Sequence, residues 1–381
     1  MRLFTWLSRH RFPYEPLITV SISRERLLHN LREFAGHANG ALIAPVLKSN
    51  AYGHGLIEVA GILREAGHIP FFVVDSYFEA IALRAKGIRT PLLVIGYTRP
   101  ETIASSHLPE MAFTIASLDA LKALLPTCRD VHTHIKIDTG MHRQGILPEE
   151  IPTAIDILQN NPRIKLDGLA THLCDADNPD ESFTQDQLRV WDKSVKTFKA
   201  VFPAIKYVHA AATDGSRYAD STTANVTRLG IGLYGLSDNA ALNARLDLKP
   251  VLAMKTIVTG VKKLEAGKTI GYGKTFKVEK KMLVATIPVG YYEGIDRRLS
   301  SIGAIQVGPK NEFCPIVGRI SMNITTIDVT TVVGVKVGME VSVISCEPDD
   351  ANSIRSMARR CDTIPYEIAV HIPAALKRVV D

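Results

Sequence analysis

Short apolar runs alternate with stretches of helical period over the first 240 residues of the chain. The runs have the length and composition of buried parallel strands, and they lie at 42–47, 70–75, 91–95, 111–115, 131–137, 166–171, 205–209 and 226–231. Eight strands separated by helices is the number that a (β/α)8 barrel requires. A strand and a helix at 17–36 precede this set, so we expect the barrel to carry an N-terminal extension.

The pattern changes after Leu236. A linker-like segment, SDNAALNARLDLKP, leads into closely spaced strand candidates with one good helix near 351–360; the strands are expected at 250–261, 281–289, 302–307, 315–318, 324–328 and 339–345. This is typical of a mostly β domain. We therefore predict an α/β protein with an N-terminal (β/α)8 TIM-type barrel and a mostly β C-terminal domain. Its expected parts are a tail at 1–14, the barrel at 15–240 and the β domain at 241–381.

Composition narrows the class of protein. Of the 381 residues, 46% are hydrophobic and 22% charged, which excludes disorder of the whole chain. No apolar run approaches the ~18 residues of a membrane span, and the start lacks the apolar stretch of a secretory signal. Five cysteines without a C-x-x-C pair favour a reducing cytoplasm. The densest basic stretch, 262–281, has lysines among strand-like residues, which favours protected strand edges over a nucleic-acid surface.

Candidate chemistry gathers where barrel strands end, because active residues of such barrels lie at the C-terminal ends of the strands. These ends hold Lys48, the segment Asp138–Arg143, His172, the segment His209–Thr213, and Arg228 with Gly230. A lysine that ends an apolar strand is partly desolvated, and desolvation favours the neutral amine that attacks carbonyl groups. The alternative is an ordinary lysine that extends its amine into water.

Three tempting motifs are rejected. GIGLYG at 230–235 fits G-x-G-x-x-G but follows the eighth strand, not the first strand of a dinucleotide-binding unit, so its glycines are better suited to cradle a phosphate. Asp138-Thr-Gly occurs once, whereas an aspartic protease needs two such carboxylates. His132 and His134 share a strand face with Lys136 and Asp138, where a metal site is possible, but no third ligand is near, so we expect packed or hydrogen-bonded histidines in preference to a metal.

Several longer segments together resemble the alanine racemase family. In chain order they are KSNAYGHG at 48–55, KIDTGMHR at 136–143, THLCDAD at 171–177, RLGIGLYGL at 228–236, GYGKTF at 271–276, IPVGYYEG at 287–294, VGRISM at 317–322 and Tyr366-Glu367. The resemblance covers residues 15–380 and keeps the family's order in both domains.

The resemblance implies a pyridoxal phosphate enzyme with two bases. Lys48 would bind the cofactor and act on the proton of the D face, and Tyr272 would act on the L face. His172 would lie beside the cofactor and relay the charge of Tyr272, and Arg228 would face the pyridine nitrogen. The remaining family positions are Tyr52, Thr213, Gly230 and Ile231 at the phosphate, Arg143, Tyr291 and Met322 at the substrate, and Lys136, a lysine carbamylated in many members.

The activity implied by the resemblance is interconversion of L- and D-alanine, which supplies D-alanine for peptidoglycan. Tyr272 in the β domain would complete the partner's site, so we expect a homodimer with shared sites. Two alternatives stay open. One is a racemase of broad specificity, or for lysine or serine, since Ala374 stands where many members have a tyrosine that narrows the entrance. The other is a non-catalytic pyridoxal phosphate carrier, although such carriers lack a β domain.

The chain departs from the family pattern at a few further positions. Strand 7 has Ala212-Thr213 where Asn-Ser is usual, so a threonine hydroxyl would contact the phosphate and an asparagine is lost. The usual Gly-Tyr-Ala-Asp-Gly is Gly-Tyr-Tyr-Glu293-Gly, and Asn323 replaces an aspartate that often follows the methionine.

Overall fold

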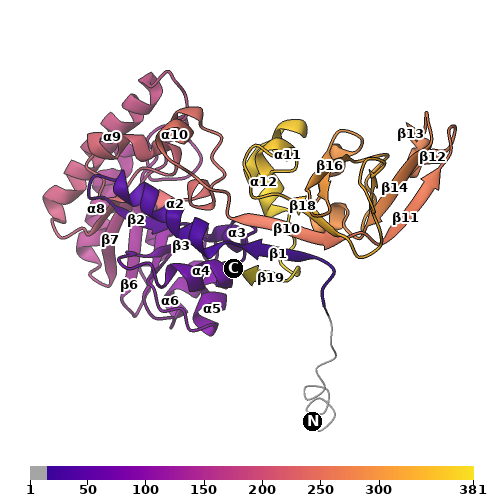
Figure 1. Ribbon diagram of the computed structural model, residues 1–381. Coiled ribbons are helices and arrows are strands. Elements are labelled where there is room, and N and C mark those ends of the chain that lie inside the picture. Colours follow the sequence, from indigo (N-terminus) through magenta and orange to yellow (C-terminus); the bar gives the residue numbers. More distant parts are fainter. Residues whose placement is uncertain (1–14) are drawn as a thin grey trace, which may run out of the picture. The chain divides into compact units, whose positions relative to one another are not determined.

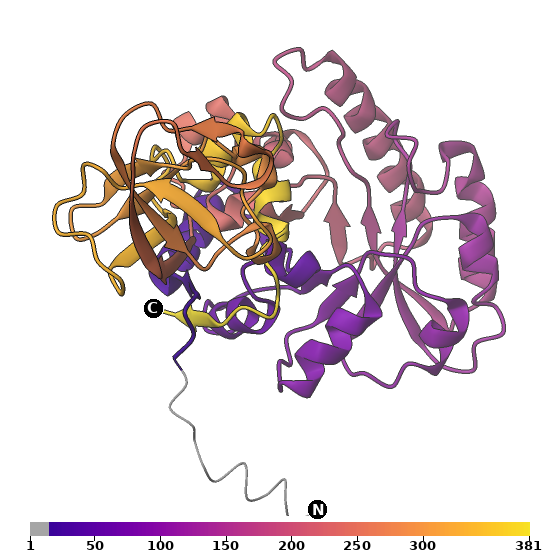
Figure 2. The same ribbon diagram turned by 90° about the vertical axis from the view of Figure 1, so that its right-hand side faces the viewer.

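The computed structural model describes residues 15–381, apart from the side chains of 219–221, and the tail expected at 1–14 lies outside the described residues. The chain forms two compact units. One is Ser23–Val251 with Asp381, and the other joins the residues up to Ile22 to Leu252–Val380. Figures 1 and 2 show the elements of each unit in two views. Among the described helices, none combines the length and hydrophobicity needed to cross a membrane.

The first unit confirms the predicted barrel of eight parallel strands. Six strands pair in chain order from β3 to β8, and β2 pairs with β9. Leu47 N–H donates to Val73 O at 2.7 Å, and Arg228 N–H donates to Ala211 O at 3.0 Å. These bonds join the two sheets at both edges and close the ring. The strands are β2 (Leu42–Pro45), β3 (Phe72–Val74), β4 (Leu92–Val94), β5 (Met111–Ile115), β6 (Val131–Lys136), β7 (Ile164–Ala170), β8 (Tyr207–His209) and β9 (Val226–Leu229).

Helices cover the outside of these strands (Figure 2). The longest, α9, buries Leu188, Trp191, Val195 and Phe198, which recur at helical spacing on one face. The helices are α2 (Arg24–Gly36), α3 (Lys48–Tyr52), α4 (Leu56–Leu63), α5 (Tyr77–Ala85), α6 (Pro100–Ser105), α7 (Leu118–Lys122), α8 (Ile151–Asn160), α9 (Ser182–Val201) and α10 (Ala240–Arg245). Of these, α10 falls inside the predicted linker.

The second unit is mostly β, as predicted. A six-stranded sheet has the order β16-β15-β18-β10-β1-β19, a three-stranded sheet the order β11-β14-β17, and β12 pairs with β13. Its strands are β1 (Thr19–Ile22), β10 (Leu252–Ile257), β11 (Gly260–Leu264), β12 (Thr269–Ile270), β13 (Phe276–Lys277), β14 (Met282–Ile287), β15 (Ala304–Val307), β16 (Glu312–Pro315), β17 (Thr325–Asp328), β18 (Glu340–Ile344) and β19 (Arg378–Val380), and its helices are α11 (Ile354–Arg360) and α12 (Pro365–Val370).

Several details of this unit differ from the sequence predictions. The strand expected to extend the barrel is β1, which pairs antiparallel with β10 and parallel with β19. Its alternating burial is that of a sheet with one covered face, unlike β3, β4 and β9 of the barrel, which are buried throughout. The strand predicted at 250–261 is two strands, because the chain changes sheets at Val258–Thr259, and the strand predicted at 315–318 lies at β16. A second helix, α12, begins at Pro365, a residue suited to a first helical turn.

Candidate active site

Lys48 begins a left-handed turn at the C-terminal end of β2. The next four residues have positive φ, at 56° for Ser49, 55° for Asn50, and 52° for Ala51 and Tyr52. A left-handed conformation costs a residue with a Cβ roughly 1–2 kcal/mol. Four such residues in succession therefore need support from the surrounding structure, and backbone strain of this kind gathers at functional sites.

Hydrogen bonds from inside and outside the turn provide that support. Ala51 N–H donates to Leu47 O at 2.8 Å, and Leu56 N–H donates to the Asn50 side chain at 2.9 Å. Glu79, at the start of α5, accepts from the Asn50 N–H at 3.3 Å. Its carboxylate also accepts from the backbone N–H of Asp75, at 2.9 Å. Glu79 thus ties the Lys48 turn to the neighbouring β3–α5 loop, a role that the sequence analysis missed.

The four residues expected at a phosphate converge after β8 and β9. Thr213 accepts a hydrogen bond from Gly232 N–H at 3.2 Å, and Gly230 begins the short helix η3 (Ile231–Tyr234). A Cβ at Gly230 would lie 2.7 Å from the Tyr52 hydroxyl and 4.0 Å from Thr213 Oγ1. Glycine at 230 therefore lets the Tyr52 hydroxyl lie close to the backbone, near the Thr213 hydroxyl, and two hydroxyl groups beside backbone N–H groups suit a phosphate.

A side chain at position 230 is predicted to weaken phosphate binding. Gly230→Ala would place its methyl group against the buried Tyr52 hydroxyl, and overpacking of this kind typically costs 1–3 kcal/mol. We expect the affinity for pyridoxal phosphate to fall roughly tenfold or more, measured by equilibrium dialysis. Gly61→Ala is the control, because a Cβ there meets no atom within 4 Å. Equal affinity of the two variants for pyridoxal phosphate would show that Gly230 is not part of a phosphate site.

Arg228 is buried at the end of β9 without a carboxylate partner among the described residues. Its Nη1 donates to His209 Nδ1 at 2.8 Å and to His209 O at 2.7 Å. Its Nη2 donates to Thr171 O at 2.7 Å, His172 Nδ1 at 3.1 Å and Ala210 O at 3.1 Å. Burial lowers the pKa of Arg228 to about 10, so the guanidinium keeps its charge at neutral pH.

The cation of Arg228 shapes the titration of its neighbours. Burial, followed by the charge of Arg228, lowers the pKa of His172 to about 3. Burial and the charges of Arg228 and Arg143 lower the pKa of Lys136 to about 8. His172 is therefore neutral at pH 7. Since Arg228 can only donate, His172 Nδ1 accepts, and the ring proton is on Nε2.

The two histidines of β6 are hydrogen-bonded, as predicted in preference to a metal site. His132 Nδ1 lies 2.6 Å from Asp167 Oδ2. His134 Nδ1 lies 2.7 Å from His209 Nε2 inside the barrel. With the bond from Arg228 to His209, this makes a continuous chain of three side chains from β6, β8 and β9. Sequence reasoning missed this chain, because its members are far apart in the sequence.

The loop after β6 holds Arg143 beside Lys136. Asp138 accepts from Gly140 N–H at 2.9 Å and from His142 N–H at 3.0 Å, which turns the chain back sharply. Asp138 therefore stabilises the conformation of this loop. Lys136 Nζ donates to Gln144 at 3.4 Å, and Arg143 is exposed.

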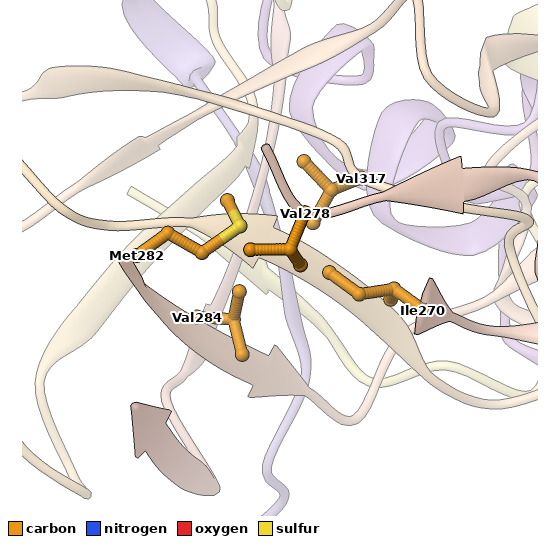
Figure 3. Close-up of a cluster of buried hydrophobic side chains, with 5 residues drawn as sticks. All are labelled: Ile270, Val278, Met282, Val284 and Val317. Atoms are coloured by element: carbon orange, nitrogen blue, oxygen red, sulfur yellow. The ribbon is translucent and has the colours of Figure 1, made fainter. Parts of the chain in front are cut away.

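Tyr272 lies on a rigid turn of the second unit. It is 70% exposed, between β12 and β13, and the turn has Gly271 at φ 73° and Gly273 at φ 70°. Beneath the hairpin lies a small core, shown in Figure 3, made of Ile270, Val278, Met282, Val284 and Val317. Ile270, two residues before the tyrosine, is a member of that core. Packing thus fixes the turn while the phenol points into solvent.

The other two candidates of the second unit lie side by side. Tyr291 N–H donates to Ser321 O at 3.1 Å, and Tyr292 N–H donates to Met322 O at 2.9 Å. The chains approach so closely that a Cβ at Gly290 would lie 2.2 Å from Ser321 O. The segment that ends at Met322 also borders the Tyr272 turn, because a Cβ at Gly271 would lie 3.3 Å from Arg319 N.

Two departures from the family pattern meet at this place. Asn323 Nδ2 donates to Glu293 Oε1 at 2.6 Å, and Glu293 Oε2 accepts from Gly290 N–H at 2.8 Å. The amide donor at 323 thus satisfies the buried carboxylate at 293. Ala374 is exposed two residues beyond Ile372, whose Cα would lie 3.0 Å from a Cβ at Gly294.

The expected site residues therefore fall into two groups. The barrel brings together Lys48, Tyr52, Lys136, Arg143, His172, Thr213, Arg228, Gly230 and Ile231 at its C-terminal end, and the second unit presents Tyr272, Tyr291 and Met322 on adjoining loops. In the barrel group, Lys48, the cation of Arg228 and the candidate phosphate site at Gly230 all lie at the C-terminal end of the barrel.

Comparison with known proteins finds relatives over both units. Residues 22–238 match the family model of the alanine racemase N-terminal domain, and residues 251–380 match that of the C-terminal domain. The chain is 34% identical to an alanine racemase of Sorangium cellulosum over 372 residues, covering 94% of this chain and 97% of that protein. It is 32% identical to alanine racemase 1 of Caldanaerobacter subterraneus over 366 residues, covering 94% of each.

Solved structures are similar over the same span. Alanine racemase of Clostridium difficile superposes with a TM-score of 0.88 at 28% identity, covering 97% of this chain and 96% of that one. Alanine racemase of Bacillus anthracis with bound L-Ala-P gives a TM-score of 0.87 at 28% identity, covering 97% and 96%.

Proposed function

The chain belongs to the alanine racemase family, and from this premise we propose that it interconverts L- and D-alanine with pyridoxal phosphate bound at the mouth of the barrel. The observation that carries the proposal is the grouping of Lys48 with a buried, carboxylate-free Arg228 and the candidate phosphate site at Gly230.

The donor set fits this cofactor. Its phosphate matches the candidate phosphate site at Gly230 beside the hydroxyl groups of Tyr52 and Thr213. Its carbonyl carbon matches the amine of Lys48. The hydrogen bonds of Arg228 to described residues all use Nη1 and Nη2, which leaves Nε–H to donate to a pyridine nitrogen. A cation there disfavours protonation of that nitrogen.

Bound pyridoxal phosphate supplies an electron sink that stabilises negative charge at the α carbon of the amino acid. The chain's residues then move one proton. Lys48 Nζ takes or returns it on the D face, and Tyr272 Oη does so on the L face. The Tyr272 oxygen is negatively charged once it has given up its proton, and a hydrogen-bond donor beside it stabilises that charge. His172 Nε2–H, with the cation of Arg228 behind it, is suited to be that donor.

Arg143 and the backbone N–H of Met322 would bind the substrate carboxylate, with Tyr291 beside them. Exposure of Tyr272, Tyr291 and Met322 supports a homodimer in which the second unit of one protomer completes the site of the other. The free thiols of all five cysteines support a cytoplasmic enzyme. Supply of D-alanine to peptidoglycan is the role we propose for it.

Lys136 is proposed to carry a carbamate. With a pKa of about 8, its neutral amine becomes abundant as the pH rises through 8, and that form bonds to the carbon of CO2 and releases a proton. The anion would orient Arg143. We expect Lys136→Gln to raise the KM for alanine roughly 10- to 100-fold, the range of a lost bond to a charged group.

Carbon-13 NMR with labelled CO2 tests the modification directly. A carbamate resonance should be present in the native protein and in the control Lys165→Gln, which changes a lysine paired with Asp130 at the barrel surface. It should be absent in Lys136→Gln. A native protein without the resonance, or an unchanged KM in the variant, would remove this part of the proposal.

Enantiomer-resolved turnover of the pyridoxal phosphate-loaded protein tests the proposed activity. L-alanine, L-serine, L-lysine and L-arginine are supplied separately, and the D product is quantified by chiral chromatography. We expect alanine to dominate. Comparable rates on the larger side chains would instead support a broad racemase, with exposed Ala374 as the residue that opens the entrance. Inactivity on all four would support a non-catalytic carrier.

A further inference from the structure

A second pocket opens at the opposite end of the barrel, where the strands begin. Its cavity volume is about 330 Å³, within the range of small-molecule sites. The first residues of β4, β5, β6 and β8 line it, together with Phe71 just before β3 and Asp167 within β7, and none of the candidate active-site residues does. Apolar and aromatic side chains, among them Phe71, Leu93, Met111 and Tyr207, form about half of its wall, and polar groups form the rest.

One buried polar side chain, His134, faces this pocket. It is 2% exposed and is among the lining residues. Its ring packs edge-on against Phe71, with centroids 5.4 Å apart, and stacks with Tyr207 at 5.7 Å. These contacts fix the ring plane, while Nδ1 is held by His209 at 2.7 Å.

The hydrogen-bond chain determines which ring nitrogen of His134 carries the proton. Arg228 has donors only, so His209 Nδ1 must accept from it. A neutral His209 then has its proton on Nε2 and donates it to His134 Nδ1. The proton of neutral His134 is therefore on Nε2. Among the described residues no hydrogen bond accepts from this N–H group, so it is available to donate to a molecule in the pocket.

Charge limits what could accept from it. Glu110, Asp130 and Asp167 line the pocket with a single lysine, Lys206. Asp167 is paired with His132, which also lines the pocket, and Asp130 is paired with Lys165. The excess of carboxylates disfavours an anionic ligand, and the aromatic wall favours a flat one.

We propose that this pocket is a second binding site, which takes a small uncharged heteroaromatic molecule whose ring nitrogen accepts from His134 Nε2–H. The site is distinct from the proposed active site and does not depend on the racemase activity. Through His209 its ligand would share a hydrogen-bond chain with Arg228, and such chains polarise cooperatively.

Nicotinamide and benzamide are suitable probes, because they differ in shape by little more than the ring nitrogen. Binding to the pyridoxal phosphate-loaded protein is measured by saturation-transfer NMR and calorimetry. We expect nicotinamide to bind with a dissociation constant of about 1 mM, as befits so small a ligand. We expect benzamide to bind about 3- to 10-fold more weakly, the effect of one hydrogen bond.

Two variants separate the contributions. His134→Leu should abolish the preference for nicotinamide. Ala112→Leu should abolish binding of both probes, because Ala112 lines the pocket outside the histidine chain, so it tests the site even if His134→Leu fails to fold. Failure of nicotinamide to bind, equal binding of both probes, or binding that survives Ala112→Leu would overturn the proposal, while leaving the racemase proposal intact.

Discussion

Tyr272→Phe is expected to stop proton exchange on one face of alanine while leaving it on the other. Racemisation should fall by about 10²- to 10⁴-fold, the usual contribution of a general acid or base. The kcat/KM for racemisation must fall equally in both directions, because L- and D-alanine have the same free energy and the equilibrium constant between them is one. Exchange of the α-proton with solvent has no such constraint. In the proposed mechanism Lys48 still removes and returns a proton on the D face, so D-alanine should exchange and L-alanine should not.

The measurement is proton NMR of each enantiomer in deuterium oxide with the pyridoxal phosphate-loaded variant. Tyr97→Phe is the matched control, because Tyr97 is 75% exposed, like Tyr272 at 70%, but belongs to neither group of candidate residues. Exchange of L-alanine at the native rate in Tyr272→Phe would show that another group serves the L face. The turn itself should persist, because its core of Ile270, Val278 and Met282 is untouched.

Lys48→Ala is expected to have the larger effect, with turnover falling at least 10⁴-fold. In the proposed mechanism the variant loses both the covalent anchor of the cofactor and the base of the D face, and either loss alone is severe. It should also lose the visible absorption of the lysine-bound cofactor, because the other barrel candidates would hold the cofactor without a covalent bond.

Absorption spectra and turnover distinguish this from a folding defect. The left-handed turn after Lys48 is held by backbone bonds and by Glu79, none of which involves the lysine side chain, so circular dichroism should be unchanged. Lys86→Ala, at an exposed lysine that ends α5, should keep both colour and activity. A coloured Lys48→Ala protein would mean that another amine binds the cofactor.

The sequence predicted the barrel well because its strands are short, mostly buried segments between helical stretches, and β3 and β4 are apolar and buried throughout. Candidate residues at strand ends followed from the same pattern, since the end of a parallel strand is a place defined along the chain. The sequence pattern did not predict the role of Glu79 or the hydrogen-bond chain from Arg228 through His209 to His134. Each depends on a contact across the fold, and no local spacing in the sequence reports such a contact.

The two departures from the family pattern at 293 and 323 also depend on a contact that the sequence does not report. Glu293 and Asn323 each looked like an isolated deviation, and only their bond at 2.6 Å shows that they compensate each other. The edge of the second unit was harder still. Strands β12, β13 and β19 have two or three residues each, too short for a period of two to be detected.

The second unit joins two segments that are far apart in the sequence, and this affects how it can fold during synthesis. Strand β1 is among the earliest parts of the described chain to be synthesised, yet its partners β10 and β19 begin at Leu252 and Arg378. At 5–20 residues per second, a ribosome needs roughly 10–50 s to reach β10, and longer to reach β19. Throughout that interval β1 has exposed edges, while the whole barrel is emerging behind it. The nascent chain therefore carries an unpaired strand for most of its synthesis, and this is the stage at which we expect it to depend on chaperones.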